Sequence, residues 1–369
     1  MSFKQKILSK SNSYNFYKTE YEKNKKKYES TLKENSKLKE KNKNSKEEYD
    51  KLKSEYDKLN KEYKELYNKQ YSRDRASIFC SANFHNYSFR DDFPSKLDKF
   101  LKNLPKESKK RAMLIYLRAN AAYLLNQKTL YTNEELKTQD EHRKFYNENV
   151  SENEICGFKF TDRSFNEHCF LNDFLTDADR EYIKNKDIID AGAYIGDSSL
   201  AFTELTSANV HAFEPFKESY NKMLENIELN NVSNIVPVNA SLSDKNGEDT
   251  IYLSGNNIQG ITSDKNYRRY TKSFTVKGIT IDKYVQENDL NVGFIKVDVE
   301  GTERRLLKGA IETLKSQKPI LLFSIYHTPD DFFELKPMIE KLDLGYNFKI
   351  SKERPTTFLA DTVIECRPY

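Results

Sequence analysis

A seven-residue hydrophobic repeat runs through the N-terminal part of the chain, from Tyr14 to Leu66. Its two recurring sites lie three residues apart and carry mostly tyrosine and leucine near the end of the repeat. The first site holds Tyr14, Tyr21, Tyr28, Asn35, Asn42, Tyr49, Tyr56 and Tyr63, and the second holds Tyr17, Asn24, Thr31, Leu38, Ser45, Leu52, Leu59 and Leu66. This period is typical of coiled coils, in which polar seam residues fix register and oligomeric state. It predicts a coiled-coil stalk over residues 1–71 and a homo-oligomer, with a single solvated helix as the alternative.

Residues 72–150 show helical patterns without the seven-residue repeat. The helix ends at Asp91 to Pro94, and Leu97, Phe100, Leu101 and Leu104 then share one face. A second helix from about Pro105 carries apolar residues at three- and four-residue spacing: Met113, Leu114, Leu117, Ala121, Leu124 and Leu125. We expect this stripe to be buried in a helical linker or cap subdomain.

From about Ser151 to Tyr369, short apolar runs alternate with amphipathic helices, which predicts an α/β domain with helices on both faces of a sheet. The runs that read as strands are DIID, VHAF, IVPVNAS, GFIKVD and PILLFS, followed by YNFKIS and DTVIEC, which we expect to pair antiparallel. Residues 250–280 read as a hairpin insertion around a polar loop. Within that loop, Tyr267, Arg268, Arg269 and Tyr270 are suited to contact a sugar, with a solvated loop as the alternative.

Acidic residues and glycines follow the predicted strands. After DIID, Gly192 allows a tight turn and Gly196 allows a close approach, next to Asp190. Asp197 then stands at a helix start, where we expect it to act as N-cap and to repel the phosphate that a dinucleotide site would place there. Glu214 ends the second strand, at the position of a ribose-binding carboxylate.

The segment GFIKVDVEGTE repeats this arrangement, because its apolar strand ends at Asp298 and Glu300 before Gly301 begins a new turn. Ligands bind at the carboxyl ends of strands in open α/β sheets, so both acids should line the cleft with His327, which follows a later strand. All three are candidate general bases. The alternatives are helix capping by Asp298, capping or ammonium binding by Glu300, a loop hydrogen bond for His327, and a metal held by such a group of side chains.

Charge and hydropathy narrow the class of protein. Residues 1–70 hold 20 lysines and 12 acidic residues, a net charge of +8, whereas the rest of the 369-residue chain carries −4. The interspersed acids favour a solvated helix surface, and the acidic remainder argues against a nucleic-acid substrate. No apolar run approaches the roughly 18 residues of a membrane span, and the N-terminus lacks the apolar core of a signal peptide. We therefore expect a cytoplasmic protein with no membrane span.

Five segments, in this order, resemble the FkbM family of S-adenosylmethionine-dependent methyltransferases: DAGAYIGDSS, VHAFEP, NIELNN, FIKVDVEGTE and SIYHTPDD. The resemblance covers about residues 155–369. It implies a class I methyltransferase (Rossmann-like) fold with a mainly parallel seven-stranded sheet, and O-methylation of a sugar in a glycan or of a related small molecule.

The resemblance also implies roles for single residues. Asp190, Gly192, Ala193 and Gly196 would form the turn that binds the cofactor, Glu214 would bind its ribose, and Asp298 would lie beside the transferring methyl group. Ser241 stands where many members of the wider fold have an acid against adenine, so a hydroxyl or backbone contact would replace it. We predict no metal site, with the divalent metal named above as the alternative.

Two other functions remain open from the sequence. A coiled-coil scaffold could carry an inactive or ligand-sensing methyltransferase-like domain, which the set of Asp190, Glu214 and Asp298 disfavours. An NAD-dependent enzyme is disfavoured by Asp197 at the helix start. The identity of the acceptor is left open.

Overall fold

The computed structural model describes residues 12–38, 44–72, 75–125, 129–254, 257–263 and 270–369. It divides into two compact units. The smaller one, the hairpin unit, comprises Met1–Arg73 and Gln127–Leu136, and the main unit comprises Asp74–Asn126 and Lys137–Tyr369. The predicted boundary at residue 150 is therefore not where the structure divides.

Two helices of the hairpin unit, α2 (Asn12–Leu38) and α3 (Asn44–Gln70), pack against each other. The ring of Tyr28 stacks on that of Tyr56, with centroids 4.7 Å apart, and Tyr21 also contacts Tyr56. Leu52 is buried. The short strands β1 (Tyr71–Ser72) and β2 (Thr129–Leu130) pair antiparallel in the same unit. The tyrosine seam that we predicted to join two chains thus packs within one chain.

In the described part of the main unit, seven strands form one sheet in the order β14-β15-β13-β12-β5-β6-β7. Their bounds are β5 (Asp187–Ala191), β6 (Val210–Phe213), β7 (Ile235–Val238), β12 (Val292–Val297), β13 (Ile320–Ser324), β14 (Asn347–Lys352) and β15 (Thr362–Arg367). Strands β7, β6, β5, β12 and β13 pair in parallel, and β15 is antiparallel to both β13 and β14. The mainly parallel seven-stranded sheet is confirmed.

Consecutive residues of the central strands are buried on opposite faces of this sheet. Ile188 and Phe294 pack in one hydrophobic cluster, whereas Ile189 and Ile295 pack in the other. This is why the strands read as continuous apolar runs, as in parallel sheets covered on both sides. The covering helices are α8 (Asp177–Ile183), α9 (Asp197–Phe202), α10 (Lys217–Leu229), α11 (Ile281–Asn288), α12 (Glu303–Lys308), α13 (Ile311–Gln317) and α14 (Pro329–Glu340), with 3₁₀ turns at Glu167–Phe170 and Thr203–Leu205.

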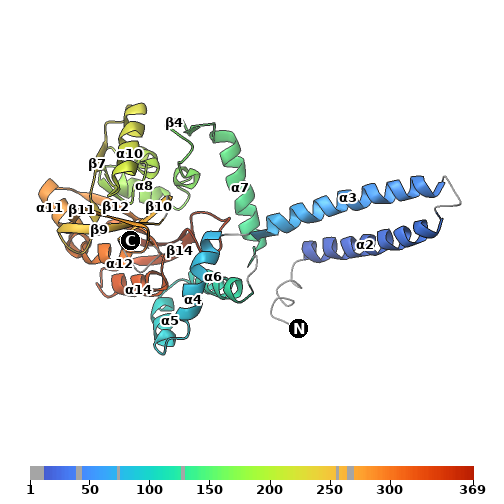
Figure 1. Ribbon diagram of the computed structural model, residues 1–369. Coiled ribbons are helices and arrows are strands. Elements are labelled where there is room, and N and C mark those ends of the chain that lie inside the picture. Colours follow the sequence, from blue (N-terminus) through green and yellow to red (C-terminus); the bar gives the residue numbers. More distant parts are fainter. Residues whose placement is uncertain (1–11, 39–43, 73–74, 126–128, 255–256, 264–269) are drawn as a thin grey trace. The chain divides into compact units, whose positions relative to one another are not determined.

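The helices α4 (Arg75–Tyr87), α5 (Phe93–Leu101) and α6 (Lys106–Leu125) belong to the same compact unit as the sheet, and Figure 1 shows them beside α14. Phe84 meets Phe332 edge to face at 5.3 Å between ring centroids, and Phe93 meets Phe333 in the same way. The helix α7 (Asn133–Asn149) follows. Residues 75–125 thus share a core with the sheet.

The buried face of α6 differs from the predicted one. Leu117 and Leu124 are 48% and 63% exposed, whereas Ala112, Ile115, Ala119 and Ala122 are buried. The stripe prediction was therefore wrong for its centre and end. The physical reason is packing against α4, because a face of alanines lets two helices approach more closely than a face of leucines.

A second, smaller sheet has the strand order β10-β9-β11-β8. It consists of β8 (Ser241–Leu242), β9 (Gly247–Ser254), β10 (Asn257–Thr262) and β11 (Lys272–Ile279), so the predicted hairpin insertion is present. Tyr270 contacts Tyr252, but the predicted sugar-binding residues Tyr267, Arg268 and Arg269 lie outside the described residues. A last antiparallel pair joins β3 (Glu154–Ile155) and β4 (Phe158–Lys159).

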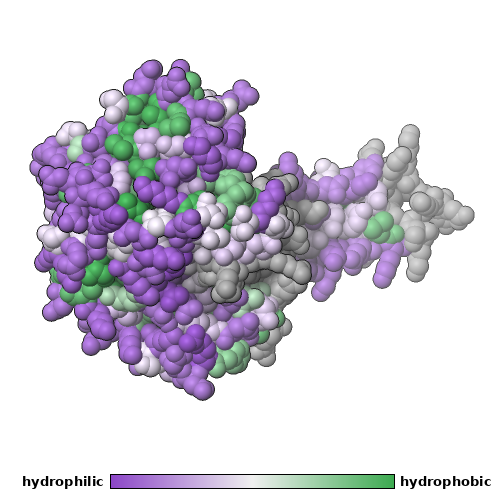
Figure 2. Space-filling view, turned by 60° about the vertical axis from the view of Figure 1, so that its left-hand side comes forward, coloured by the Kyte–Doolittle hydropathy of each residue, from purple (hydrophilic) through white to green (hydrophobic). Residues whose placement is uncertain are grey.

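Among the helices described, none combines sufficient length with sufficient apolar character to cross a membrane. The face shown in Figure 2 is largely hydrophilic, with separate small hydrophobic areas.

Candidate active site

A cavity of about 200 Å³ opens at the carboxyl edge of the main sheet, where β5, β6 and β12 end. The chain reverses its strand order here, since β6 follows on one side of β5 and β12 lies on the other; ligands bind at such a switch point in α/β sheets. Each of these strands sends residues to the cavity wall: Gly192 and Tyr194 after β5, Glu214 after β6, Asp298 and Glu300 after β12.

The turn after β5 requires glycine at two positions. Gly192 has φ +82°, and a Cβ added to it would lie 2.0 Å from the carbonyl oxygen of Asp298. Gly196 has φ +84°, and its Cβ would lie 2.9 Å from Cγ of Met223 in α10. Of the predicted turn residues, Gly192 lines the cavity, whereas Gly196 and the buried Ala193 are not part of its lining.

Gly196 is also the N-cap residue of α9, a position that we predicted for Asp197. Asp197 is instead the first residue of the helix and lines the cavity. Its carboxylate accepts hydrogen bonds from the backbone N–H groups of Asn166 (2.7 Å) and Ser198 (2.9 Å). Burial raises the pKa of Asp197 to about 6 in spite of these bonds.

Asp190 is fully buried and is not among the residues that line the cavity. One carboxylate oxygen accepts hydrogen bonds from the hydroxyls of Ser198 and Ser199, each at 2.6 Å. The other lies 3.1 Å from Nζ of Lys296, which also donates to the carbonyl oxygen of Gly192 at 2.9 Å. Asp190 therefore fixes the turn and the start of α9.

Lys296 lines the cavity and was missed by the sequence analysis, although a lysine inside the apolar run FIKVD is an unusual residue. Burial alone would lower its pKa, but Asp190 and Asp298 outweigh burial and raise it well above the usual range. The side chain is a permanent cation between two carboxylates.

Glu214 is 8% exposed and lines the cavity. Its two oxygens accept hydrogen bonds from the backbone N–H groups of Phe216 (2.8 Å) and Tyr194 (3.0 Å). Burial nevertheless raises the pKa of Glu214 to about 8. The carboxylate keeps lone pairs that hydroxyl donors of a ligand can reach.

Ser241 lines the cavity as predicted, and its hydroxyl donates to Oδ2 of Asp249 at 3.1 Å. Asp249 in turn lies 3.3 Å from a guanidinium nitrogen of Arg305. The hydroxyl proton of Ser241 is thus committed to Asp249, and its oxygen can accept a hydrogen bond from a ligand.

The residues after β12 and β13 meet at one point. Nδ1 of the buried His327 lies 2.8 Å from Oε1 of Glu303, and its Nε2 lies 3.4 Å from Oδ1 of Asp298 and 3.7 Å from Oε2 of Glu300. Asp298 and Glu300 line the cavity. Neither is the N-cap residue of α12, which is Thr302.

Burial disfavours the charged form of the His327 imidazole, but Glu303, Glu300 and Asp298 outweigh burial and raise its pKa to about 10. The imidazole is therefore protonated near neutral pH when no other cation lies in the cluster, and a protonated imidazole has no lone pair with which to accept a proton. His327 therefore stays a candidate general base only in its neutral form.

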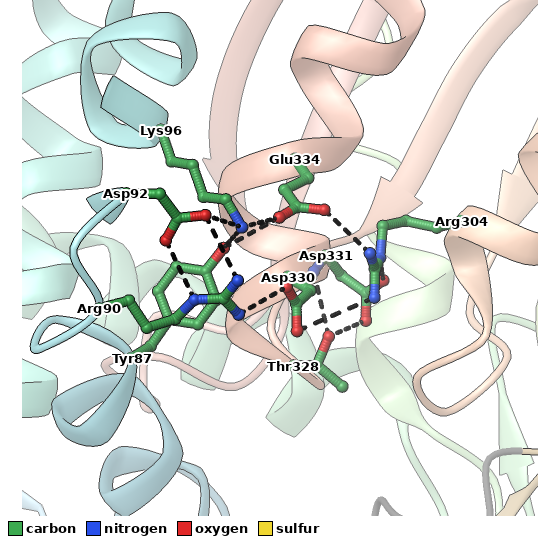
Figure 3. Close-up of polar contacts among 9 residues, drawn as sticks. All are labelled: Tyr87, Arg90, Asp92, Lys96, Arg304, Thr328, Asp330, Asp331 and Glu334. Carbon is green, nitrogen blue, oxygen red and sulfur yellow. Dashed lines mark hydrogen bonds and ion pairs between the residues drawn. The ribbon is translucent and has the colours of Figure 1, made fainter. Parts of the chain in front are cut away.

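A network of charged and polar side chains connects α12 and α14 with the helices α4 and α5 (Figure 3). Arg304, next to Glu303, lies 3.1 Å from Oδ1 of Asp331 and 3.0 Å from Oε2 of Glu334. Glu334 also pairs with Lys96 of α5 and accepts a hydrogen bond from the hydroxyl of Tyr87 of α4 at 3.1 Å. The helices that precede the sheet thus help to hold α12 and α14, which flank the cluster.

Loop residues that no sequence motif indicated complete the cavity wall. They are His168 and Cys169 from the 3₁₀ turn, and Glu353, Arg354 and Asp361 from the connection between β14 and β15. Arg354 holds Asp361 through two hydrogen bonds of 2.8 and 2.9 Å. Burial lowers the pKa of His168 to about 4, and burial with the charge of Asp298 raises that of Glu353 to about 8.

Three residues of the cavity wall have left-handed backbones without being glycine: Tyr194 (φ 50°), Glu300 (φ 55°) and Asp361 (φ 59°). Such conformations are costly for residues with a Cβ and tend to concentrate at functional sites. Their gathering around one cavity supports a ligand-binding role for it.

Comparison with known proteins finds a family that matches the part of the chain around this cavity. The family model described as the methyltransferase FkbM domain matches residues 190–350, the segment that holds Glu214, Asp298, Glu300 and His327. Residues 190–350 thus match the model of the methyltransferase FkbM domain. The predicted family resemblance is confirmed, while His168, Glu353, Arg354 and Asp361 of the cavity lie outside the matched residues.

Similar proteins include a hexuronic acid methyltransferase, AglP of Haloferax volcanii, which is 28% identical over 173 residues, 44% of this chain and 69% of that protein. The structure of methyltransferase FkbM from Methylobacillus flagellatus is 16% identical, with a TM-score of 0.49, and the match covers 77% of this chain and 60% of that one. The fibrillarin of Aeropyrum pernix, solved with natively bound S-adenosyl-L-methionine, is 11% identical with a TM-score of 0.32, over 54% of this chain and 72% of that one.

Proposed function

We propose that the FkbM domain is an S-adenosylmethionine-dependent O-methyltransferase that methylates a hydroxyl of a sugar, in a glycan or a related small molecule. The observation that carries this proposal is the convergence of Glu214, Asp197 and Asp298 on one cavity at the carboxyl edge of the sheet. A site so rich in carboxylates suits a ligand with hydroxyl donors and positive charge.

The residues present fit this cofactor. Glu214 would accept hydrogen bonds from the ribose hydroxyls, Ser241 would contact the adenine, and Asp298 would face the cationic part, since all three line the cavity. Asp197 at the start of α9 would repel the pyrophosphate of NAD. S-adenosylmethionine, when bound, supplies a methyl group on a sulfonium.

Asp298 is the proposed general base. Its carboxylate lines the cavity and keeps 32% of its side chain exposed, so it can reach the hydroxyl of an acceptor and take its proton. General bases typically contribute about 10²- to 10⁴-fold to a rate. Glu300 is the second candidate, and His327, whose Nε2 faces both carboxylates, would help to position them.

The name of the curated relative points to acidic sugars as the first acceptors to test. Arg354 lines the cavity and keeps 42% of its side chain exposed, so its guanidinium can meet a sugar carboxylate while it holds Asp361. We propose a hexuronic acid residue as the acceptor.

Two measurements test the proposal. Calorimetry should detect binding of S-adenosylhomocysteine but not of NAD, and labelled methyl groups should pass from S-adenosylmethionine to glycans that contain hexuronic acid. Binding of the cofactor without transfer to any sugar would favour the alternative, a scaffold with a ligand-sensing domain. Binding of NAD instead would overturn the assignment.

We also propose self-association through the N-terminal helices. The seven-residue repeat keeps its phase from Leu38 to Ser45, so the contact that Tyr28 makes with Tyr56 in one chain could also form between two chains. Light scattering on the full chain and on a variant without residues 1–70 tests this. The truncated protein should be a monomer with unchanged affinity for S-adenosylhomocysteine, and an unchanged mass would contradict the proposal.

A further inference from the structure

The contacts of His327 differ on the two sides of its ring. On one side, Nδ1 lies at hydrogen-bonding distance, 2.8 Å, from Glu303. On the other side, Nε2 faces Asp298 at 3.4 Å and Glu300 at 3.7 Å. The imidazole is thus fixed by one carboxylate and points its other nitrogen between two more.

These spacings match those of ligands around a metal ion. Two ligands bound tetrahedrally at about 2.1 Å lie about 3.4 Å apart, the separation between Nε2 of His327 and Oδ1 of Asp298. One ligand atom each of Asp298, Glu303 and His327 lie within 4.8 Å of one another. A histidine that binds a metal commonly donates its other N–H to a carboxylate, as Nδ1 of His327 does to Glu303.

A second observation is independent of these distances. Glu303 is 0% exposed, and within the described residues its Oε2 has no hydrogen-bond partner. The same holds for Oδ1 of Asp298, which is buried although part of that side chain faces the cavity. Buried carboxylate oxygens are normally satisfied, and an unsatisfied pair beside a histidine indicates a missing cation.

We propose that Asp298, Glu303 and His327, together with Glu300, form a binding site for one divalent transition-metal ion. Nε2 of His327 and the oxygens of Asp298 and Glu300 would be ligands, Oε1 of Glu303 would orient the ring, and its Oε2 would be available to the ion. Imidazole together with carboxylates suits Mn²⁺, Fe²⁺, Co²⁺ or Zn²⁺ better than Ca²⁺, which prefers oxygen ligands alone.

The position of the site gives the metal a role that rests on the proposed function. Asp298 and Glu300 line the cavity, so coordination positions not taken by the protein would face the acceptor. Hydroxyl and carboxylate oxygens of a hexuronic acid are suitable ligands for such an ion. The metal, bound through the buried Oδ1 of Asp298, would then hold the acceptor next to the other oxygen of that carboxylate, which would act as the general base.

The test uses the full chain without an affinity tag, stripped with a chelator and titrated with Mn²⁺, Zn²⁺ and Co²⁺. We expect one ion per chain by calorimetry, visible absorption bands for bound Co²⁺, and a nitrogen coupling in the electron spin echo spectrum of bound Mn²⁺. The last readout reports the imidazole in the unaltered protein. Absence of binding at millimolar metal, or of the nitrogen coupling, would overturn the proposal.

Variants locate the site. His327→Gln and Asp298→Asn should each weaken binding by at least 100-fold, and Glu303→Gln by about 10- to 100-fold, the usual effect of losing an orienting partner. His142→Gln is the matched control, because His142 is also buried and faces a carboxylate, that of Asp173 at 3.2 Å. It should bind metal normally; equal binding by His327→Gln would refute the assignment.

The metal site and the proposed methyltransferase function can be tested separately. Binding of S-adenosylhomocysteine to the stripped protein reports the cofactor site alone. Cofactor binding without metal binding would remove the metal site only. Metal binding without cofactor binding would keep the metal site and remove the proposed methyltransferase activity.

Discussion

Asp298 combines exposure to the cavity with a fixed backbone, which few of its acidic neighbours do. Its N–H donates to the carbonyl oxygen of Ala191 at 3.0 Å, so the ends of β12 and β5 hold its position. The buried Asp190 and the buried His327 both lack this exposure. At the scale of single residues, the ability to take a proton from an acceptor therefore depends on which carboxylates remain exposed to the cavity.

Replacing Asp298 with Asn tests this directly. The change keeps the volume but removes the basic carboxylate, so we expect turnover to fall by about 10²-fold or more with a much smaller change in affinity for S-adenosylhomocysteine. Asp289→Asn is the control, because it makes the same chemical change at an exposed position. A folded Asp298→Asn variant with near-normal turnover would move the role to Glu300 or Glu353.

Glu214 predicts a dependence of cofactor binding on pH. Its pKa in the folded protein is about 8, above its ordinary value of 4.5, so the ligand-free fold loses stability from this group as pH rises between the two. Ribose hydroxyls require the ionised form as acceptor. Affinity for S-adenosylhomocysteine should therefore be about tenfold weaker at pH 7 than at pH 9.

Calorimetry across this pH range measures the effect, and Glu214→Gln provides the comparison. The variant should bind weakly and with a flatter pH dependence. An equally steep dependence in Glu214→Gln would assign the titration to another group.

At the scale of elements, strands were easier to predict than helix faces. Ile188 and Ile189 are both buried because the sheet is covered on both sides, so an apolar run was sufficient evidence for β5. In α6, the leucines and the alanines each formed a stripe at helical spacing. Which stripe is buried depends on the fit against α4, and that information is not local to the helix.

Two alanine variants check the orientation of α6. Ile115→Ala removes buried methyl groups and should lower the free energy of unfolding by about 2–5 kcal/mol. Leu117→Ala removes a similar volume from a side chain that is 48% exposed and should cost less than about 0.5 kcal/mol. Chemical denaturation measures both, and the reverse order would mean that the predicted stripe is the buried one.

At the scale of the main unit, the helices of residues 75–125 belong to the structure of the site. The ends of β5, β6 and β12 could be predicted to meet, because parallel strands place their carboxyl ends at one edge. The contributions of Glu353 and Arg354, and the link from Tyr87 and Lys96 to Glu334, could not. They depend on how segments that are far apart in the sequence pack against the sheet, and no spacing of residues in the sequence indicates this packing.

Glu334→Gln tests this link. The change leaves Lys96 and Arg304 short of a partly buried partner, so we expect a loss of about 1–3 kcal/mol in the free energy of unfolding, discounted for the 25% exposure of the side chain. Glu107→Gln is the control, because its pair with Lys110 is 75% exposed and should contribute less than about 0.5 kcal/mol. Equal effects would show that the network does not stabilise the unit.

The left-handed backbone conformations of the cavity wall determine where a substitution by glycine can stabilise this protein. A left-handed backbone costs a residue with a Cβ about 1–2 kcal/mol, whereas glycine adopts it freely. Glu300 (φ 55°) is therefore a position where loss of the side chain can raise heat resistance. A library of variants selected only for thermal stability should accumulate glycine there, and the most stable variants should have the lowest catalytic activity.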